Sequence, residues 1–157
     1  MQPLRHLVRL PGEERGISAI EFGLIAPLIA VLIIGIIDFG MGLWRQMEVA
    51  DAAAAGAAYA AAKGWNSTVG GIENAVTGAT GFAAITASPA PTWPPWCGCP
   101  NGSGVTAATC GSYCSDGSMA GHYITVYAQA PYSTILPWPG IGNPMTLSAT
   151  AYARVYP

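Results

Sequence analysis

The sequence has very little charge. Only 9% of its 157 residues are Asp, Glu, Lys or Arg, against about 25% in an ordinary soluble domain. The formal net charge is −2, so the chain lacks the basic surface that binds nucleic acid through its phosphates. It also lacks the high net charge that keeps a chain disordered. A surface so poor in charge is poorly soluble as a free monomer, which points to a membrane, a polymer or both.

Side chains suited to catalysis are also scarce. His6 and His122 are the only histidines, and the acids after Gly64 are Glu73 and Asp116. A triad of His122, Asp116 and a serine would lie beside a flexible Gly/Ser loop that does not fix its geometry. The two acids are too far apart in sequence to suggest paired acid–base catalysis, and no Gly-rich phosphate loop follows a predicted strand. We therefore predict a protein without enzymatic activity and without a cofactor.

The chain has one long hydrophobic segment. Residues 22–37 carry no charge and are bounded by Glu21 and Asp38. They give roughly 24 Å of helix, and the stretch from Ile17 to Trp44 supplies the rest of the roughly 30 Å that a bilayer core requires. We predict a transmembrane helix over residues 17–44. The arginines of the first 15 residues place its N-terminus in the cytoplasm, so the rest of the chain lies outside the inner membrane.

The helical pattern continues beyond the membrane. Residues 46–63 are rich in alanine, the best helix former. Lys63 followed by Gly64 is typical of a helix C-terminus, so residues 45–64 are predicted to extend the same helix. Pro27 should kink it or cost it a backbone hydrogen bond. A helix that is small on nearly every side is expected to pack among copies of itself rather than against one small domain.

Residues 65–157 are expected to form a small domain outside the membrane. Residues 69–85 are predicted to form a short helix, and the Pro/Trp-rich stretch 89–100 an edge strand or extended segment. Residues 123–130 and 145–156 alternate apolar and polar positions, as strands do. The predicted fold class is therefore α+β, with a long N-terminal helix and a small antiparallel sheet packed on its outer half.

Four cysteines lie in this outer domain, at Cys97, Cys99, Cys110 and Cys114. Outside the inner membrane disulfides persist, and four cysteines allow three pairings. We favour the two pairings that join the first two cysteines to the last two, each closing a loop worth about 3 kcal/mol. A zinc site with four cysteine ligands is the alternative, with His122 as the only extra ligand nearby. Its spacing lacks the usual C-x2-C, so we predict no metal.

Residues 15–22, Arg-Gly-Ile-Ser-Ala-Ile-Glu-Phe, resemble the prepilin-peptidase site of the type IV pilin superfamily. The resemblance implies a basic leader of residues 1–16, cleavage between Gly16 and Ile17, and a mature helix with Glu21 as its fifth residue and Phe22 after it. A carboxylate at the start of a lipid-embedded helix is costly unless it is paired. In a pilus, the free α-amine of a neighbouring subunit pairs with it, and the N-terminal end of the helix dipole favours it.

A more particular resemblance covers residues 15–63 and, less closely, residues 122–157. Glu21-Phe22, Pro27, Asp38-Phe39-Gly40 and the Ala-rich stretch with Gly56 and Tyr59 are similar to the TadE-like family, minor pseudopilins of the tight-adherence (Flp) pilus. That family often carries arginines where this chain has Ala55 and Ala58. The resemblance implies a pilin-like fold and a role in pilus biogenesis, adhesion and surface colonisation.

The implied partners are a prepilin peptidase, other pilins or pseudopilins, the pilus assembly machinery and inner-membrane lipid. The protein would be single-pass in the bacterial inner membrane with its C-terminal domain in the periplasm, and a further expectation is incorporation into the extracellular pilus. The competing hypothesis is a permanent single-pass protein that anchors a periplasmic binding domain. Trp93, Trp96 and Trp138 fit either the core of the outer domain or an exposed binding patch.

Overall fold

The computed structural model describes residues 13–156, and for residues 13–17 it describes the backbone alone. Two α-helices, one 3₁₀ turn and four strands follow one another along the chain. In order they are α1 (Glu13–Lys63), η1 (Gly64–Asn66), α2 (Val69–Thr77), β1 (Trp96–Asn101), β2 (Gly104–Ala107), β3 (Gly121–Tyr132) and β4 (Met145–Val155). The strands form one antiparallel sheet in the order β2-β1-β3-β4. The predicted α+β class, with a long N-terminal helix and a small antiparallel sheet as in pilins, is confirmed.

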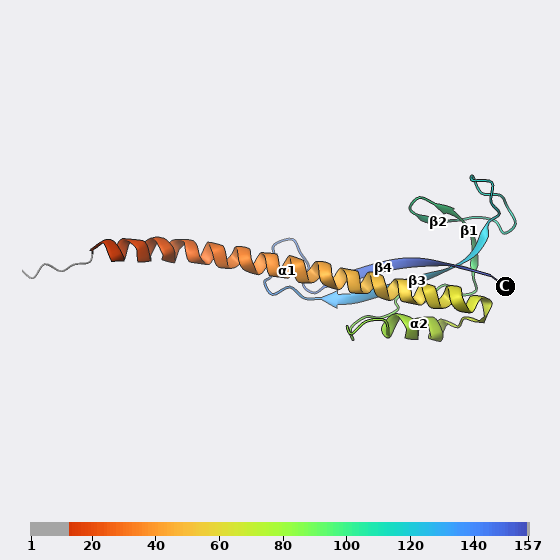
Figure 1. Ribbon diagram of the computed structural model, residues 1–157, viewed down its shortest axis with the longest axis horizontal. Coiled ribbons are helices and arrows are strands. Elements are labelled where there is room, and N and C mark those ends of the chain that lie inside the picture. The colour runs from red at the N-terminus through yellow and green to blue at the C-terminus, as the bar shows by residue number, and fades with distance from the viewer. Residues whose placement is uncertain (1–12, 157) are drawn as a thin grey trace, which may run out of the picture.

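Helix α1 runs along the whole length of the molecule. Its N-terminal half projects alone, while β3 and β4 lie along its C-terminal half and α2 covers another side of that half (Figure 1). The helix continues through Pro27 and ends, as predicted, at Lys63. Gly64 has φ +54°, and a Cβ atom there would lie 2.6 Å from the carbonyl oxygen of Tyr156. Only glycine meets both demands without strain, so this residue ends the helix.

The core lies between the C-terminal half of α1, α2 and one face of the sheet. The predicted inward face of β3 is confirmed, because Ile124, Val126 and Ala128 are fully buried, although Tyr123 and Thr125 on the opposite face are buried too. The other members of the core come from every neighbouring element. They are Val49, Ala52, Ala53, Ala57 and Ala60 of α1, Ile72 and Val76 of α2, Ile85 of the segment between α2 and β1, Ala130 and Tyr132 of β3, and Leu147, Ala153 and Val155 of β4.

One face of the Ala-rich stretch therefore packs within its own chain, against one small domain. Ala54, Ala58, Ala61 and Ala62 on the other face are exposed, and packing of that face among copies stays a prediction. The physical reason for the packing within the chain is visible at Gly56. A Cβ atom at this position would lie 2.5 Å from Cγ2 of Val76 in α2 and 2.8 Å from Cγ1 of Val126 in β3. The small side chains of α1 let a second helix and a sheet approach it closely at the same level.

Helix α2 and the Pro-rich stretch have other bounds than predicted. Helix α2 begins where Thr68 accepts a hydrogen bond from the amide of Gly71 (3.1 Å), a typical N-cap. It ends at Thr77 instead of continuing to residue 85, because Gly78 and Gly81 weaken the helix beyond that point. The Pro-rich stretch 89–100 forms a strand only in its last residues, from Trp96 onward.

Strand β1 is internal, so its predicted edge position is wrong. Strand β2 covers the other side of β1 and was not predicted from the sequence. Residues Trp96–Gly98 pair with β3, and Gly98–Asn101 pair with β2. Because β1 changes neighbours at Gly98, Pro100 lies beyond the pairing with β3 and no ladder hydrogen bond to that strand is lost.

Candidate functional site

The N-terminal half of α1 is covered by almost nothing. The helical segment Ser18–Asn66 contains a stretch long and apolar enough to cross a membrane, and 6% of that stretch is buried. Large apolar side chains are exposed all around it, such as Phe22 (71% exposed), Leu24 and Leu28. Contact with water would be very unfavourable for a surface of this kind. This helix fits a single-pass membrane anchor.

The residues predicted for processing and assembly lie at the free end of this helix. Gly16 and Ile17 belong to the helical backbone of α1, but their side chains lie outside the described residues, as do residues 1–12 of the predicted leader. Glu21 and Phe22 are both exposed. Among the described side chains none bonds to the Glu21 carboxylate. The site is therefore open to a partner from another molecule.

Asp38 holds the most distinctive polar site in the molecule. Its carboxylate lies at the end of the apolar segment, yet the residue is only 3% exposed. Oδ1 accepts a hydrogen bond from the amide of Ile135 (2.8 Å). Oδ2 accepts two more, from the amide of Leu136 (3.3 Å) and from the indole Nε1 of Trp138 (2.9 Å). The hydroxyl of Tyr132 also donates to the Asp38 backbone carbonyl (2.9 Å).

These hydrogen bonds hold the loop between β3 and β4, residues 133–144, against the middle of α1. In Figure 1 this connection, which we call the 133–144 loop, extends past the sheet and lies against the helix. A buried carboxylate is tolerated when several donors satisfy it, and here two backbone amides and an indole do so. Asp38 is thus a fastening point between segments about 100 residues apart in the chain.

From sequence, Asp38 is predicted only as a boundary residue of the membrane segment, and this role is not predicted. Two signals were present. A carboxylate next to a lipid-facing segment is costly without a partner, and the 133–144 loop contains a tryptophan whose indole N–H needs an acceptor when it is buried. What sequence could not supply is the length of β3, which carries the loop back to the middle of the helix.

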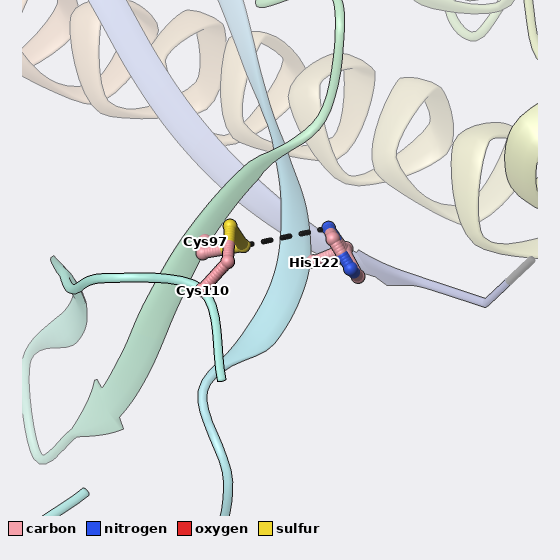
Figure 2. A group of neighbouring side chains, drawn as sticks. All are labelled: Cys97, Cys110 and His122. Atoms are coloured by element: carbon pink, nitrogen blue, oxygen red, sulfur yellow. Dashed lines mark hydrogen bonds between the residues drawn. A yellow bond between two sulfur atoms is a disulfide. The ribbon is translucent and has the colours of Figure 1, made fainter. Parts of the chain in front are cut away.

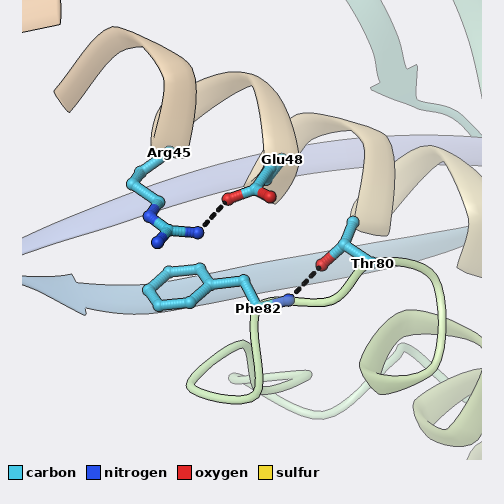
Figure 3. Close-up of polar contacts among 4 residues, drawn as sticks. All are labelled: Arg45, Glu48, Thr80 and Phe82. Atoms are coloured by element: carbon cyan, nitrogen blue, oxygen red, sulfur yellow. Dashed lines mark hydrogen bonds and ion pairs between the residues drawn. The ribbon is translucent and has the colours of Figure 1, made fainter. Parts of the chain in front are cut away.

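A second contact lies about two to three turns beyond Asp38 along α1. Arg45 forms an ion pair with Glu48 (2.6 Å), and its guanidinium lies 4.2 Å from the centre of the Phe82 ring. The amide of Phe82 in turn donates to the hydroxyl of Thr80 (3.3 Å). Figure 3 shows these side chains joining the helix to the segment that follows α2. Arg45 therefore stabilises the domain as well as marking the end of the predicted membrane segment, and Trp44 beside it is exposed.

All four cysteines are in disulfides. One bridge joins Cys97 to Cys110 and the other joins Cys99 to Cys114, which is one of the two connectivities that the sequence left open. The sulfurs of Cys97 and Cys110 lie within 4.8 Å of a His122 ring nitrogen, and Nδ1 is 3.6 Å from Cys97 Sγ. Figure 2 shows His122 beside this bridge. Because a disulfide sulfur carries no thiolate, this group does not provide the ligands of a zinc site.

His122 and Asp116 have separate surroundings. The His122 ring packs edge-on against Trp65, with 5.3 Å between ring centres. Asp116 accepts hydrogen bonds from the hydroxyl (2.7 Å) and amide (2.9 Å) of Ser118, and these bonds lower the pKa of its carboxyl below the usual value. Both bonds are local, so Asp116 stabilises a turn of the disulfide-bonded segment.

Trp93, Trp96 and Trp138 do not belong to the buried core of the outer domain. Trp93 is 41% exposed, and Trp96 and Trp138 are half-buried. Trp96 donates to the hydroxyl of Thr125 (3.0 Å), and Trp93 and Trp96 line an open groove on the sheet. Trp138 lies elsewhere, beside α1.

The N-terminal half of α1, its exposed Glu21 and the fastened Asp38 belong to one sequence segment. The family described as TadE-like protein matches residues 16–58. The chain has a TadE-like N-terminal segment. No curated protein and no solved structure matches the chain. The TadE-like segment begins at Gly16 and ends within the buried Ala-rich stretch, so it includes both halves of the helix and Asp38.

Proposed function

We propose that this protein is a minor pseudopilin that takes part in the biogenesis of a tight-adherence pilus. It enters the inner membrane as a precursor, is cut by a prepilin peptidase between Gly16 and Ile17, and then joins other pilins or pseudopilins. Its contribution to adhesion and surface colonisation is through this assembly. The observation that carries the proposal is the TadE-like match over residues 16–58, which starts at the residue before the proposed cleavage site.

The exposed half of α1 supports this function. An apolar helix that projects from its own domain needs lipid before assembly and other helices after it. In lipid, helices associate through packing and through the few polar groups they carry. Glu21 is exposed near the start of the helix, where the α-amine created by cleavage in a neighbouring subunit would pair with it.

The proposed function divides the chain into four segments. Residues 1–16 are the leader, residues 17–44 cross the membrane, residues 45–64 continue the helix outside it, and residues 65–157 form the periplasmic domain. The basic leader would remain in the cytoplasm. The two disulfides, Cys97–Cys110 and Cys99–Cys114, suit the oxidising periplasm.

N-terminal sequencing of the protein purified from membranes tests the processing step. With an active prepilin peptidase we expect a mature N-terminus at Ile17, and without the peptidase the precursor should persist. Gly16→Leu should block cleavage, and the matched change Gly23→Leu, at a position with open space around it, should leave cleavage intact. A precursor that stays uncut in the presence of the peptidase would favour the permanent membrane-anchored binding protein.

The assembly step is tested by replacing the proposed pairing carboxylate. Glu21→Ala should leave membrane insertion and cleavage unchanged but reduce the amount of sheared pilus. Glu48→Ala is the control for loss of a helix carboxylate, because Glu48 pairs within the chain with Arg45. Wild-type piliation by the Glu21→Ala variant would remove the assembly role of this residue.

A further inference from the structure

We propose that the 133–144 loop inserts into the outer face of the membrane, where its apolar side chains and the cavity behind it contact lipid acyl chains. This inference rests on the membrane anchoring that is part of the proposed function. It adds a second membrane contact, made by the domain rather than by the spanning helix. The depth of the loop, its chemistry and the cavity each support it.

The depth of the loop follows from its contacts with α1. A Cβ atom at Gly35 would lie 3.2 Å from Cη2 of Trp138, and the rings of Phe39 and Trp138 have centres 6.4 Å apart. Gly35 lies within the uncharged segment, and the axial distance from Ile17 to Gly35 is about 27 Å. The hydrocarbon core is about 30 Å thick. If Ile17 lies at the inner edge, Trp138 reaches the outer boundary of the hydrocarbon.

The chemistry of the loop suits this position. Residues 133–144 contain no charged side chain, and Ile135 is 60% exposed. The amides of Ile135 and Leu136 are bonded to Asp38, the amide of Ile141 is bonded to the Trp138 carbonyl (3.2 Å), and Pro137 and Pro139 have no N–H to satisfy. Bonded or absent donors reduce the cost of placing irregular backbone near lipid.

A cavity opens between the loop and the helix. It has a volume of about 220 Å³ and is lined mainly by apolar side chains, among them Phe39, Leu43, Tyr132, Trp138, Ile141 and Met145. An apolar cavity of roughly 150 Å³ already stays dry and accepts a benzene-sized molecule. Because this cavity is continuous with the exposed apolar surface of α1, the occupant that fits its place and chemistry is part of a lipid acyl chain.

Fluorescence quenching by lipid-borne bromine measures this contact. The full chain is placed in phosphatidylcholine vesicles with brominated acyl chains, and variants with one added tryptophan are compared with the parent. Ile135→Trp, in the loop, should add fluorescence that brominated lipid quenches. Met119→Trp is the matched control, because Met119 is 55% exposed but lies in the disulfide-bonded segment. Its added fluorescence should not be quenched.

Replacing the native Trp138 provides an independent test of the same contact. Trp138→Phe should lower the quenchable part of the fluorescence, whereas Trp93→Phe should lower only the unquenchable part. Ile25→Trp, at an exposed position in the middle of the predicted span, reports on membrane anchoring itself. Quenching at position 25 without quenching at positions 135 and 138 would overturn the loop inference and leave the anchoring intact, with a neighbouring subunit as the alternative occupant. Absence of quenching at position 25 would overturn both.

Discussion

Residues 18–37 and residues 49–60 belong to one continuous helix, but they are built for different surroundings. The first segment is rich in Leu, Ile and Val, and its side chains are mostly exposed. The second is mostly alanine with one glycine, and it buries Val49, Ala52, Ala53, Ala57 and Ala60. The segment with the larger side chains thus has the fewer contacts within its own chain.

This difference reflects what surrounds each segment. Fluid lipid adapts to bulky side chains, so the first segment gains by being large and apolar. The second segment is packed by a helix on one side and a sheet on another, and the backbones approach closely only where side chains are small. Asp38 lies between the two segments and joins the helix to the far end of the β3–β4 hairpin.

The largest loss of stability is expected at Gly56, where the C-terminal half of α1 is most tightly packed. Gly56→Leu should lower the free energy of unfolding by about 3 kcal/mol or more, because even a Cβ atom there would collide with Val76 and Val126. Gly40→Leu is the control, since nothing lies within 4 Å of a Cβ atom at that site. Chemical denaturation in detergent measures both, and equal effects would contradict the difference between the two halves.

Truncation should distinguish the halves in the same way. Val49→Ala removes two methyl groups from a fully buried site and should cost about 2 kcal/mol in unfolding free energy. Leu28→Ala removes more carbon from an exposed site and should leave the unfolding of the domain in detergent unchanged. A large loss of domain stability in the Leu28→Ala variant would show that the projecting half contributes to the fold.

The connection between the halves is tested at Asp38. Asp38→Ala removes the acceptor for the amides of Ile135 and Leu136, so hydrogen exchange at these two amides should accelerate by roughly tenfold or more. Asp51→Ala, on an exposed face of the same helix, should not change their exchange. Unaltered protection of both amides in the Asp38→Ala variant would mean that other contacts hold the 133–144 loop.

The smallest effect is a dependence on alkaline pH. Burial, together with the nearby negative charge of Asp38, raises the pKa of the Tyr132 hydroxyl above its ordinary value. The folded state then holds this proton more tightly than the unfolded state. The resulting stability is present below about pH 10 and declines as the pH rises toward the folded-state pKa. Tyr132→Phe should remove this part of the decline in unfolding measurements between about pH 9 and 11.

Much of the architecture was predictable because the signals are local. The uncharged segment, the Lys63–Gly64 helix end and the alternation at Ile124, Val126 and Ala128 each follow from a few neighbouring residues. The errors concern contacts between distant segments. The burial of one face of the Ala-rich stretch depends on Val76 and Val126, which are distant from it in sequence. The internal position of β1 depends on β2, which covers its other side.

The sequence by itself determined the long helix, its change from large to small side chains, the TadE-like pattern over residues 16–58 and the strands that alternate. Each is a matter of composition and spacing along one segment. Only the tertiary structure decided that Asp38 is buried by the 133–144 loop, that Gly56 is pressed between α2 and β3, and which cysteines pair. Such contacts depend on the lengths and directions of the intervening elements, which set the distances between residues far apart in the chain.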